Sequence, residues 1–179
     1  MGYNSIILSG LPCSGKTTLA NKLSDHYGWP VYSLGGLWRE TWKQKYPNGE
    51  VSFEDFWART SLEENRAMNL KAVEIFKEGN IIADTRYAIY ADHLPALFVF
   101  ITAPLDIRSK RAIVSGKYKG TSKEIENLLI KREEDELKMG KDLIGESYDY
   151  RDPSLYHLVI NSGLLSIEKE FSLVRNLME

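Results

Sequence analysis

The sequence predicts an α/β fold: a five-stranded parallel sheet flanked by helices, with a helical insertion and a short lid. Three observations lead to this prediction. Short, almost entirely apolar runs, typical of strands buried on both faces, recur along the chain. Most of them alternate with segments whose apolar residues repeat at helical spacing. A glycine-containing turn joins the first strand directly to the first helix.

The first strand and the first helix are predicted over residues 5–9 and 16–27. The apolar run of the strand ends at Gly10, and the helix is expected to end at Gly28, a typical C-terminal stop. A second short strand follows at 31–33. The apolar face of the helix consists of Leu19, Ala20, Leu23 and Tyr27.

Residues 35–79 are predicted to form a mostly helical insertion. Ser52 and Asp55 have the spacing of a capping box, with Asp in place of the commoner Glu. Phe53, Phe56 and Trp57 then share one helix face. A longer helix is expected over 62–77, because apolar residues recur through it until Gly79.

Three further strands are predicted over 81–84, 97–101 and 158–160. The first of them ends in Asp84, and Pro104 follows the second where a helix would start. A last helix is expected over 166–177. Because no internal repeat, low-complexity tract or Gly/Ser linker interrupts the chain, we predict a single domain over residues 1–179.

The composition excludes several classes of protein. The chain has 179 residues and a formal net charge of −2, so it lacks the basic field of proteins that bind polymeric nucleic acid. Its single cysteine, Cys13, cannot form an intrachain disulfide and suits a reducing compartment. No apolar stretch approaches the length of a membrane span. We therefore expect a cytoplasmic monomer that binds neither a membrane nor polymeric nucleic acid.

The turn after the first strand carries the most specific motif. Residues 10–17, Gly-Leu-Pro-Cys-Ser-Gly-Lys-Thr, fit the P-loop pattern G-x-x-x-x-G-K-[ST], whose backbone N–H groups point at phosphate oxygens. The following helix presents its positive dipole end to the same anion. Lys16 is expected to reach the β- and γ-phosphates of ATP, and Thr17 to coordinate Mg²⁺. The predicted ATP-binding residues are Gly10, Pro12, Cys13, Ser14, Gly15, Lys16, Thr17 and Thr18.

A P-loop alone does not distinguish a kinase from a GTPase or another ATPase. The chain has no Asn-Lys-x-Asp motif, which argues against a GTPase, and it is too short for the extra elements of motor or helicase ATPases. The helical insertion and a basic segment after the fourth strand lie where small P-loop kinases hold their acceptor and close their lid. These features favour a kinase.

Several segments resemble the cytidylate kinase-like nucleoside monophosphate kinases, especially their short archaeal-type branch. Besides the P-loop, the matching segments are 32–40, 78–86, 103–111, 131–134 and 155–162, so the resemblance covers most of the chain. It implies a nucleoside monophosphate kinase-like P-loop fold in which 35–79 binds the acceptor and 116–132 form the lid. The implied reaction is transfer of the γ-phosphate of ATP, with Mg²⁺, to a nucleoside monophosphate, with CMP or dCMP as the favoured acceptor.

The resemblance also implies roles for individual residues. Ser33 and Arg39 match the residues that meet the acceptor, and an arginine can grip phosphate oxygens with two donors. Arg86 matches an arginine that holds the acceptor phosphate. Asp84 is expected to contact the substrates and to orient Mg²⁺ through water. The implied catalytic residues are Lys16, Arg86, Arg111 and Arg132.

The predicted lid is rich in cations. It carries Lys117 and Lys119 between two glycines, and its closure would exclude water and so suppress hydrolysis of ATP. In phosphoryl transfer the protein mainly positions groups and neutralises charge. The arginines considered for this role are Arg108, Arg111 and Arg132.

Departures from the family pattern bear on the choice of base. Thr85 stands where the family commonly has glycine, and Trp38 replaces a smaller aromatic residue. One of the tryptophans of the insertion is a candidate to stack on a base. Two other functions stay open: a P-loop kinase whose acceptor is the hydroxyl of a non-nucleotide molecule, and a non-catalytic regulator that binds ATP.

Overall fold

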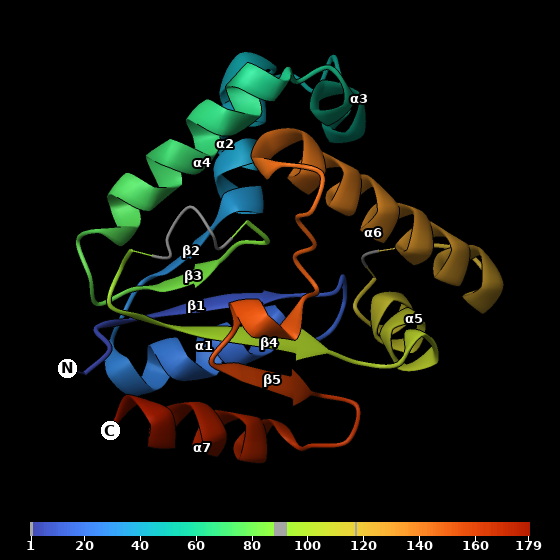
Figure 1. The fold of residues 1–179 in the computed structure, drawn as a ribbon. Coiled ribbons are helices and arrows are strands. Elements are labelled where there is room, and N and C mark those ends of the chain that lie inside the picture. The colour runs from blue at the N-terminus through green and yellow to red at the C-terminus, as the bar shows by residue number, and fades with distance from the viewer. Residues whose placement is uncertain (1, 88–92, 117) are drawn as a thin grey trace.

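The centre of the fold is a parallel sheet with the strand order β2-β3-β1-β4-β5 (Figure 1). The computed structural model describes residues 2–87, 93–116 and 118–179. All five predicted strands are present, and the predicted fold class is confirmed. The strands span Ser5–Gly10 (β1), Val31–Ser33 (β2), Ile82–Asp84 (β3), Ala96–Thr102 (β4) and Leu158–Asn161 (β5).

Helices cover both faces of this sheet, as expected for a parallel sheet. A 3₁₀ turn, η2, spans Pro153–Leu155. The α-helices span Lys16–Tyr27 (α1), Leu34–Lys45 (α2), Phe53–Ala58 (α3), Leu62–Phe76 (α4), Leu105–Val114 (α5), Ser122–Ile144 (α6) and Ile167–Met178 (α7).

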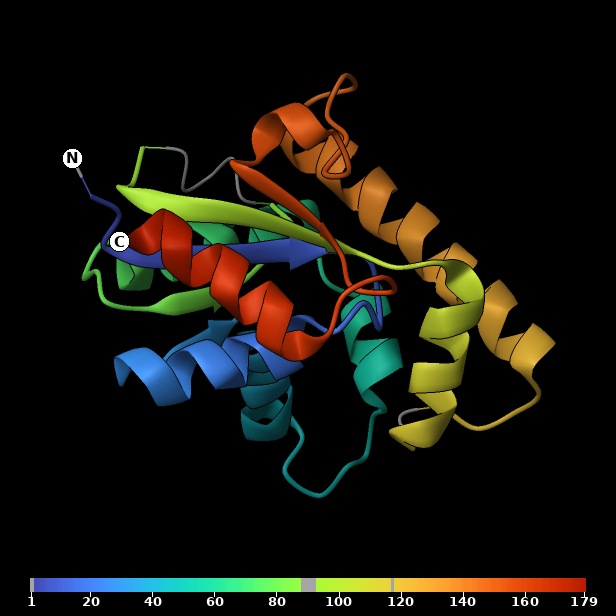
Figure 2. The ribbon, with the colours of Figure 1, turned by 90° about the horizontal axis from the view of Figure 1, so that it is seen from below.

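The face of the sheet seen in Figure 2 is covered by α1 and α7. Leu23 of α1 and Val174 of α7 are fully buried against strand residues such as Leu97 of β4. Each such side chain contributes roughly 1.5–3 kcal/mol of hydrophobic free energy when it is fully buried. This layer fixes the start of α1, and with it the P-loop, against the central strand.

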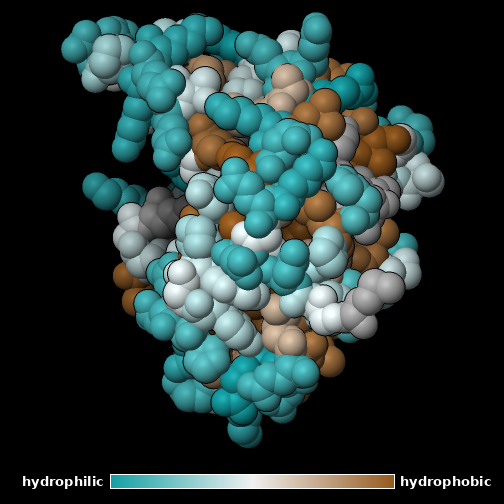
Figure 3. All heavy atoms as spheres, turned by 90° about the vertical axis from the view of Figure 1, so that its left-hand side faces the viewer, coloured by the Kyte–Doolittle hydropathy of each residue, from teal (hydrophilic) through white to brown (hydrophobic). Residues whose placement is uncertain are grey.

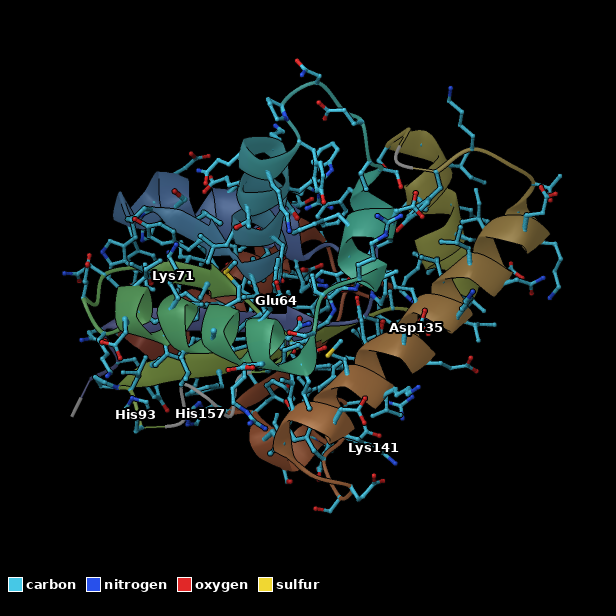
Figure 4. All side chains as sticks on the ribbon, turned by 90° about the horizontal axis from the view of Figure 1, so that it is seen from above. Glu64, Lys71, His93, Asp135, Lys141 and His157 are labelled. Carbon is cyan, nitrogen blue, oxygen red and sulfur yellow. The ribbon has the colours of Figure 1, made fainter. Side chains whose placement is uncertain are left out.

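The opposite face is covered by α2, α4 and α6, whose residues share one core cluster. Of these helices, α4 lies in front of the strands in Figure 4. Phe76 of α4 and Leu143 of α6 pack in the same core cluster as Phe98 of β4. The three helices α2, α3 and α4 occupy the predicted insertion, and α2 begins at Leu34, one residue earlier than the predicted boundary.

Residues 122–132 of the segment predicted as a lid belong to helix α6, which continues to Ile144. It begins at Ser122 because Thr121 and Glu124 form a capping box, in which each side chain satisfies the other residue's backbone N–H. Ser61 and Glu64 form a second box at the start of α4. The box predicted at Ser52 is incomplete: its hydroxyl caps α3, but no reciprocal bond to its own N–H is present.

The two ends of the strands lie on opposite sides of the molecule. Figure 3 shows the side of the molecule at the amino ends of the strands, where hydrophilic atoms cover most of the surface and hydrophobic atoms form small separate areas. The carboxyl ends point to the other side, where ligands of open α/β sheets gather. In the described ranges, no helix has the length and apolar character needed to cross a membrane.

Candidate functional site: a cleft around the P-loop

A cleft of about 710 Å³ opens at the carboxyl ends of the strands. The P-loop, which follows the central strand β1, forms its floor. Residues at the ends of β2 and β3 line one side, and α5 together with the β5–α7 connection lines the other. Of the predicted site residues, the cleft is lined by Pro12, Cys13, Ser14, Gly15, Lys16, Thr17, Thr18, Ser33, Arg39, Asp84, Arg86, Arg111 and Arg132.

Gly10 is the one predicted ATP-binding residue that does not line the cleft. A Cβ atom at this position would lie 2.0 Å from the carbonyl oxygen of Ile101 in β4, and its φ of +141° is one that L side chains rarely adopt. The first glycine of the motif is therefore required for close packing of β1 on β4. Its expected role in binding ATP stays a prediction.

Lys16 lies at the floor of the cleft with its side chain folded onto the P-loop. Its Nζ donates hydrogen bonds to the carbonyl oxygens of Gly10 at 2.9 Å and Leu11 at 2.8 Å. Burial, followed by the positive charge of Arg86, lowers the pKa of Lys16 to about 7. The ammonium group is thus held in an unfavourable environment that an added anion would improve.

Two buried oxygen atoms at the cleft lack partners among the described residues. They are Oδ1 of Asp84, at the end of β3, and Oγ of Ser14 in the P-loop. Buried polar atoms in folded proteins are normally satisfied, so these two are candidates to meet a ligand.

Two groups at the cleft are of the type that holds a magnesium ion together with phosphates. Mg²⁺ is usually bound by one or two carboxylates or hydroxyls together with substrate phosphates and water. Asp84 supplies an unsatisfied carboxylate oxygen and Thr17 an exposed hydroxyl at the same cleft. No cluster of three or more His, Cys, Asp or Glu ligands occurs in the described ranges, and a phosphate-bound ion does not require one.

A carboxylate that the sequence did not single out joins two of the predicted catalytic arginines. Glu136 of α6 accepts hydrogen bonds from Nε of Arg86 at 2.5 Å and from Nε of Arg132 at 2.9 Å. Arg132 also donates to the hydroxyl of Tyr118 at 2.7 Å. The spacing of four residues on one helix was a signal for the contact between Arg132 and Glu136, but not for the contact with Arg86.

The network keeps all of its groups charged. Burial raises the pKa of Glu136, but the adjacent Arg86 and Arg132 outweigh it and hold this pKa below its ordinary value. Burial lowers the pKa of Arg86, and Glu136 and then Asp84 raise it on balance above the ordinary range. The cleft therefore carries fixed positive charge next to Lys16.

The two residues predicted to meet an acceptor lie at the β2 side of the cleft. The Ser33 hydroxyl caps α2 by accepting a hydrogen bond from the backbone N–H of Gly36 at 2.8 Å. Arg39, one turn further along α2, is exposed. Its Nη1 donates to the carbonyl oxygen of Gly35 at 3.3 Å, and its guanidinium lies 5.1 Å from the ring centroid of Phe53.

Arg111 lies on α5 and ties the P-loop to the end of β5. Its Nη1 donates to the carbonyl oxygen of Ser14 at 3.1 Å and to the hydroxyl of Ser162 at 2.8 Å. Its Nη2 donates to the carbonyl oxygen of Ser162 at 2.8 Å. Arg111 therefore lines the cleft from helix α5.

Two groups of sequence-based candidates do not line this cleft. Arg108 is buried away from the cleft, where it donates to the carbonyl oxygens of Ala103 and Pro12 and pairs with Glu133 at 2.5 Å. None of the tryptophans lines the cleft. Trp38 is buried in the insertion, 5.2 Å from Trp57 in an edge-to-face contact.

The lid itself is only partly described. Lys119 is exposed and does not line the cleft. Lys117 lies outside the described residues.

Comparison with known proteins identifies the family. The family model of the cytidylate kinase-like family matches residues 5–164. The cytidylate kinase of Pyrococcus horikoshii is 31% identical over 95% of this chain and 85% of its own length. The cytidylate kinase of Methanocaldococcus jannaschii is 27% identical over 97% of both chains.

Solved structures show the same fold at low identity. An uncharacterized protein from Eubacterium ventriosum superposes with a TM-score of 0.71 at 17% identity, covering 97% of both chains. Shikimate kinase from Bacteroides thetaiotaomicron gives 0.61 at 17% identity, again with 97% coverage of both chains. These two likenesses concern the fold alone, whereas the family model covers most of the chain. The chain belongs to the cytidylate kinase-like family.

Proposed function

We propose that this chain transfers the γ-phosphate of ATP to CMP or dCMP, giving ADP and the nucleoside diphosphate. The coarser assignment, an ATP-dependent nucleoside monophosphate kinase, follows from membership of the family. The choice of a cytosine nucleotide rests on the names of the relatives, and the choice of a phosphate as acceptor rests on the cleft.

One observation carries the proposal. The cleft contains cations for two separate anions: Lys16 at the P-loop, and Arg39 and Arg86 on the side formed by β2, α2 and β3. In the part of the chain that the structure describes, Nη1 and Nη2 of Arg86 donate no hydrogen bond to protein. Phosphates and carboxylates are the groups that such free guanidinium donors bind with two hydrogen bonds.

Each group in the cleft has a physical task in the proposed reaction. The P-loop N–H groups and Lys16 bind the triphosphate of the donor, and the helix α1 dipole adds to this attraction. Arg39 and Arg86 hold the acceptor phosphate in line with the γ-phosphate. Arg132 neutralises charge on the phosphoryl group in transit. Bound Mg²⁺, for which Thr17 and Asp84 are the candidate ligands, offsets the charge of the phosphate oxygens.

A non-nucleotide acceptor remains the second candidate because of Asp84. The hydroxyl of such an acceptor must lose a proton, whereas the phosphate of a nucleoside monophosphate is already an anion. Asp84 is the carboxylate at the cleft with an unsatisfied buried oxygen, so it could act as that base. A D84N enzyme that loses transfer while keeping its affinity for Mg·ATP would favour this second function.

The proposed function is tested by measuring ADP release across the ribo- and deoxyribonucleoside monophosphates. We expect CMP and dCMP to give the highest kcat/KM. An enzyme that releases ADP no faster with any of these nucleotides than with water alone contradicts the proposal. Shikimate and simple sugars serve as non-nucleotide comparison acceptors.

A further inference from the structure

Glu170 is a largely buried residue at the cleft that the proposed reaction does not use. Its exposed fraction is 4%, and no hydrogen bond or ion pair of its carboxylate is present in the described ranges. It lies in the first turns of α7, on the face that carries Ile167, Phe171 and Val174. A carboxylate in an apolar helix face costs stability unless something binds it.

The position of Glu170 along the cleft indicates which part of a ligand it would meet. The P-loop follows the central strand. Asp84 and Arg86, which are proposed to bind Mg²⁺ and the acceptor phosphate, lie at the end of β3 on one side of it. The nucleoside of the donor must then extend to the other side, towards β4 and β5. Glu170 lines the cleft on that side.

The lining of this end suits a flat aromatic ring with one polar edge. Val114 of α5 is 88% exposed, and with Leu165 and Ile167 it offers apolar surface to the cleft. The polar neighbours Lys110 and Ser115 come from the same helix α5. An ionised carboxylate only accepts hydrogen bonds, so its partner must be a donor.

We propose that Glu170 accepts a hydrogen bond from the exocyclic 6-amino group of the donor adenine and so selects ATP over GTP. Guanine carries a carbonyl oxygen at the same ring position, which would face the carboxylate as a second acceptor. A site built around a buried hydrogen bond rejects an analogue that leaves it unmade. The proposal rests on the orientation of ATP in the proposed function and extends it to the choice of donor.

The protein does not satisfy Glu170 by itself. Arg111 is near enough to lower the pKa of Glu170, but burial outweighs this effect and raises that pKa above its ordinary value. The Nη atoms of Arg111 are committed to Ser14 and Ser162. The nearby Glu168, by contrast, forms a surface ion pair with Lys22 at 3.4 Å.

The test measures donor binding without an acceptor. Calorimetry with Mg²⁺ gives the Kd of wild type, E170Q and E170A for ATP, GTP and the 5′-triphosphate of purine riboside, which lacks the 6-amino group. Wild type is expected to bind ATP more tightly than both analogues by about tenfold or more. In E170Q the ratio of the affinities for ATP and GTP should fall about tenfold, because a glutamine amide can also donate to guanine. E170A should weaken the binding of ATP without strengthening the binding of GTP.

The controls separate this idea from its alternatives. E168Q removes a carboxylate from the same helix without touching the cleft, and its ATP:GTP ratio is expected to match that of wild type. An E170Q ratio within twofold of wild type overturns the proposal. The proposal is also overturned if the Glu170 variants change the affinity for ATP relative to 2′- or 3′-deoxy-ATP and not the affinity for ATP relative to GTP. Glu170 would then bind the ribose.

Two further results keep the test interpretable. If E170Q and E170A do not fold, E170D retains the carboxylate at a shorter reach and should show an intermediate ratio. If wild type phosphorylates no nucleoside monophosphate, the proposed acceptor is wrong, and the donor ratios still decide the role of Glu170.

Discussion

The carboxylate of Glu136 accepts a hydrogen bond from Nε of Arg86 at 2.5 Å, although 50 residues of sequence separate the two. The same carboxylate holds Arg132 by Nε at 2.9 Å. Contact through Nε leaves Nη1 and Nη2 of Arg86 without a protein partner in the described ranges, and both arginines line the cleft. We interpret Glu136 as a positioning residue that sets the direction of the two guanidinium groups.

Replacing Glu136 by glutamine should lower kcat more than it changes KM for the acceptor. The amide keeps one oxygen acceptor, and its NH₂ group repels the second guanidinium. We expect kcat to fall by about 10–100-fold, in the range seen when supporting groups of a site are lost. Steady-state kinetics with varied CMP separates kcat from KM.

The matched control is E133Q. Glu133 lies on the same helix and forms an ion pair of similar burial, but its partner Arg108 does not line the cleft. Both variants should lose thermal stability, and only E136Q should lose kcat to this extent. A lower KM for CMP with an unchanged kcat would show that Glu136 competes with the acceptor phosphate, contrary to our interpretation.

Much of the site could be predicted because it is encoded locally. Gly15, Lys16 and Thr17 belong to one contiguous motif. Asp84 ends an apolar strand and Arg86 follows shortly after it, and parallel strands bring their carboxyl ends to one edge of the sheet. The motif and the sheet topology therefore bring these residues close together, whatever the side-chain packing elsewhere.

The rest depends on contacts between distant segments. The sequence around Arg132 is a run of charged residues, and only the packing of α6 decides which of its carboxylates turns inward to Arg86. Arg108 looked equivalent to Arg111 in sequence, but it is buried against Glu133. Glu170 did leave a signal, because it falls on the apolar face of the last helix.

Removing Arg39 should weaken the binding of the acceptor and leave the binding of ATP almost unchanged. Its guanidinium is exposed at the acceptor side, and a hydrogen bond to a charged group contributes about 1.5–3 kcal/mol. KM for CMP in R39A should therefore rise by about 10–100-fold, while KM for ATP stays within about twofold. K43A, which removes an exposed cation of the same helix away from the cleft, should leave both constants unchanged. Equal losses for both substrates in R39A would contradict the assignment.

The affinity for ATP should fall as the pH rises above 7. The pKa of Lys16 is lowered to about 7 in the empty cleft, and bound phosphates raise it again, so the complex holds more protons than the free enzyme. Between pH 7.5 and 9 the association constant should decrease by up to about tenfold per pH unit. Calorimetry in buffers of different ionisation enthalpy should detect uptake of up to one proton. In K16R the uptake should disappear, because arginine stays charged; uptake that persists would place the proton elsewhere.

Gly10 should be the least replaceable glycine of the P-loop. The Cβ of G10A would meet Ile101 at 2.0 Å, so we expect the free energy of unfolding to fall by about 3 kcal/mol or more. G49A also has a positive φ, of +73°, but no atom lies within 4 Å of the added Cβ. Its expected cost is only about 1 kcal/mol. Urea denaturation compares the two variants, and similar losses would contradict the close approach of β1 and β4.

The central claim is that a donor and an acceptor nucleotide lie end to end in one cleft. The most direct test is the melting temperature of the enzyme with a linked cytidine–adenosine pentaphosphate, compared with ATP, CMP and both together. Because selective binding to the folded state raises the melting temperature, the linked compound should give the largest shift, and R39A should reduce it. A shift no larger than that of ATP alone would contradict the account.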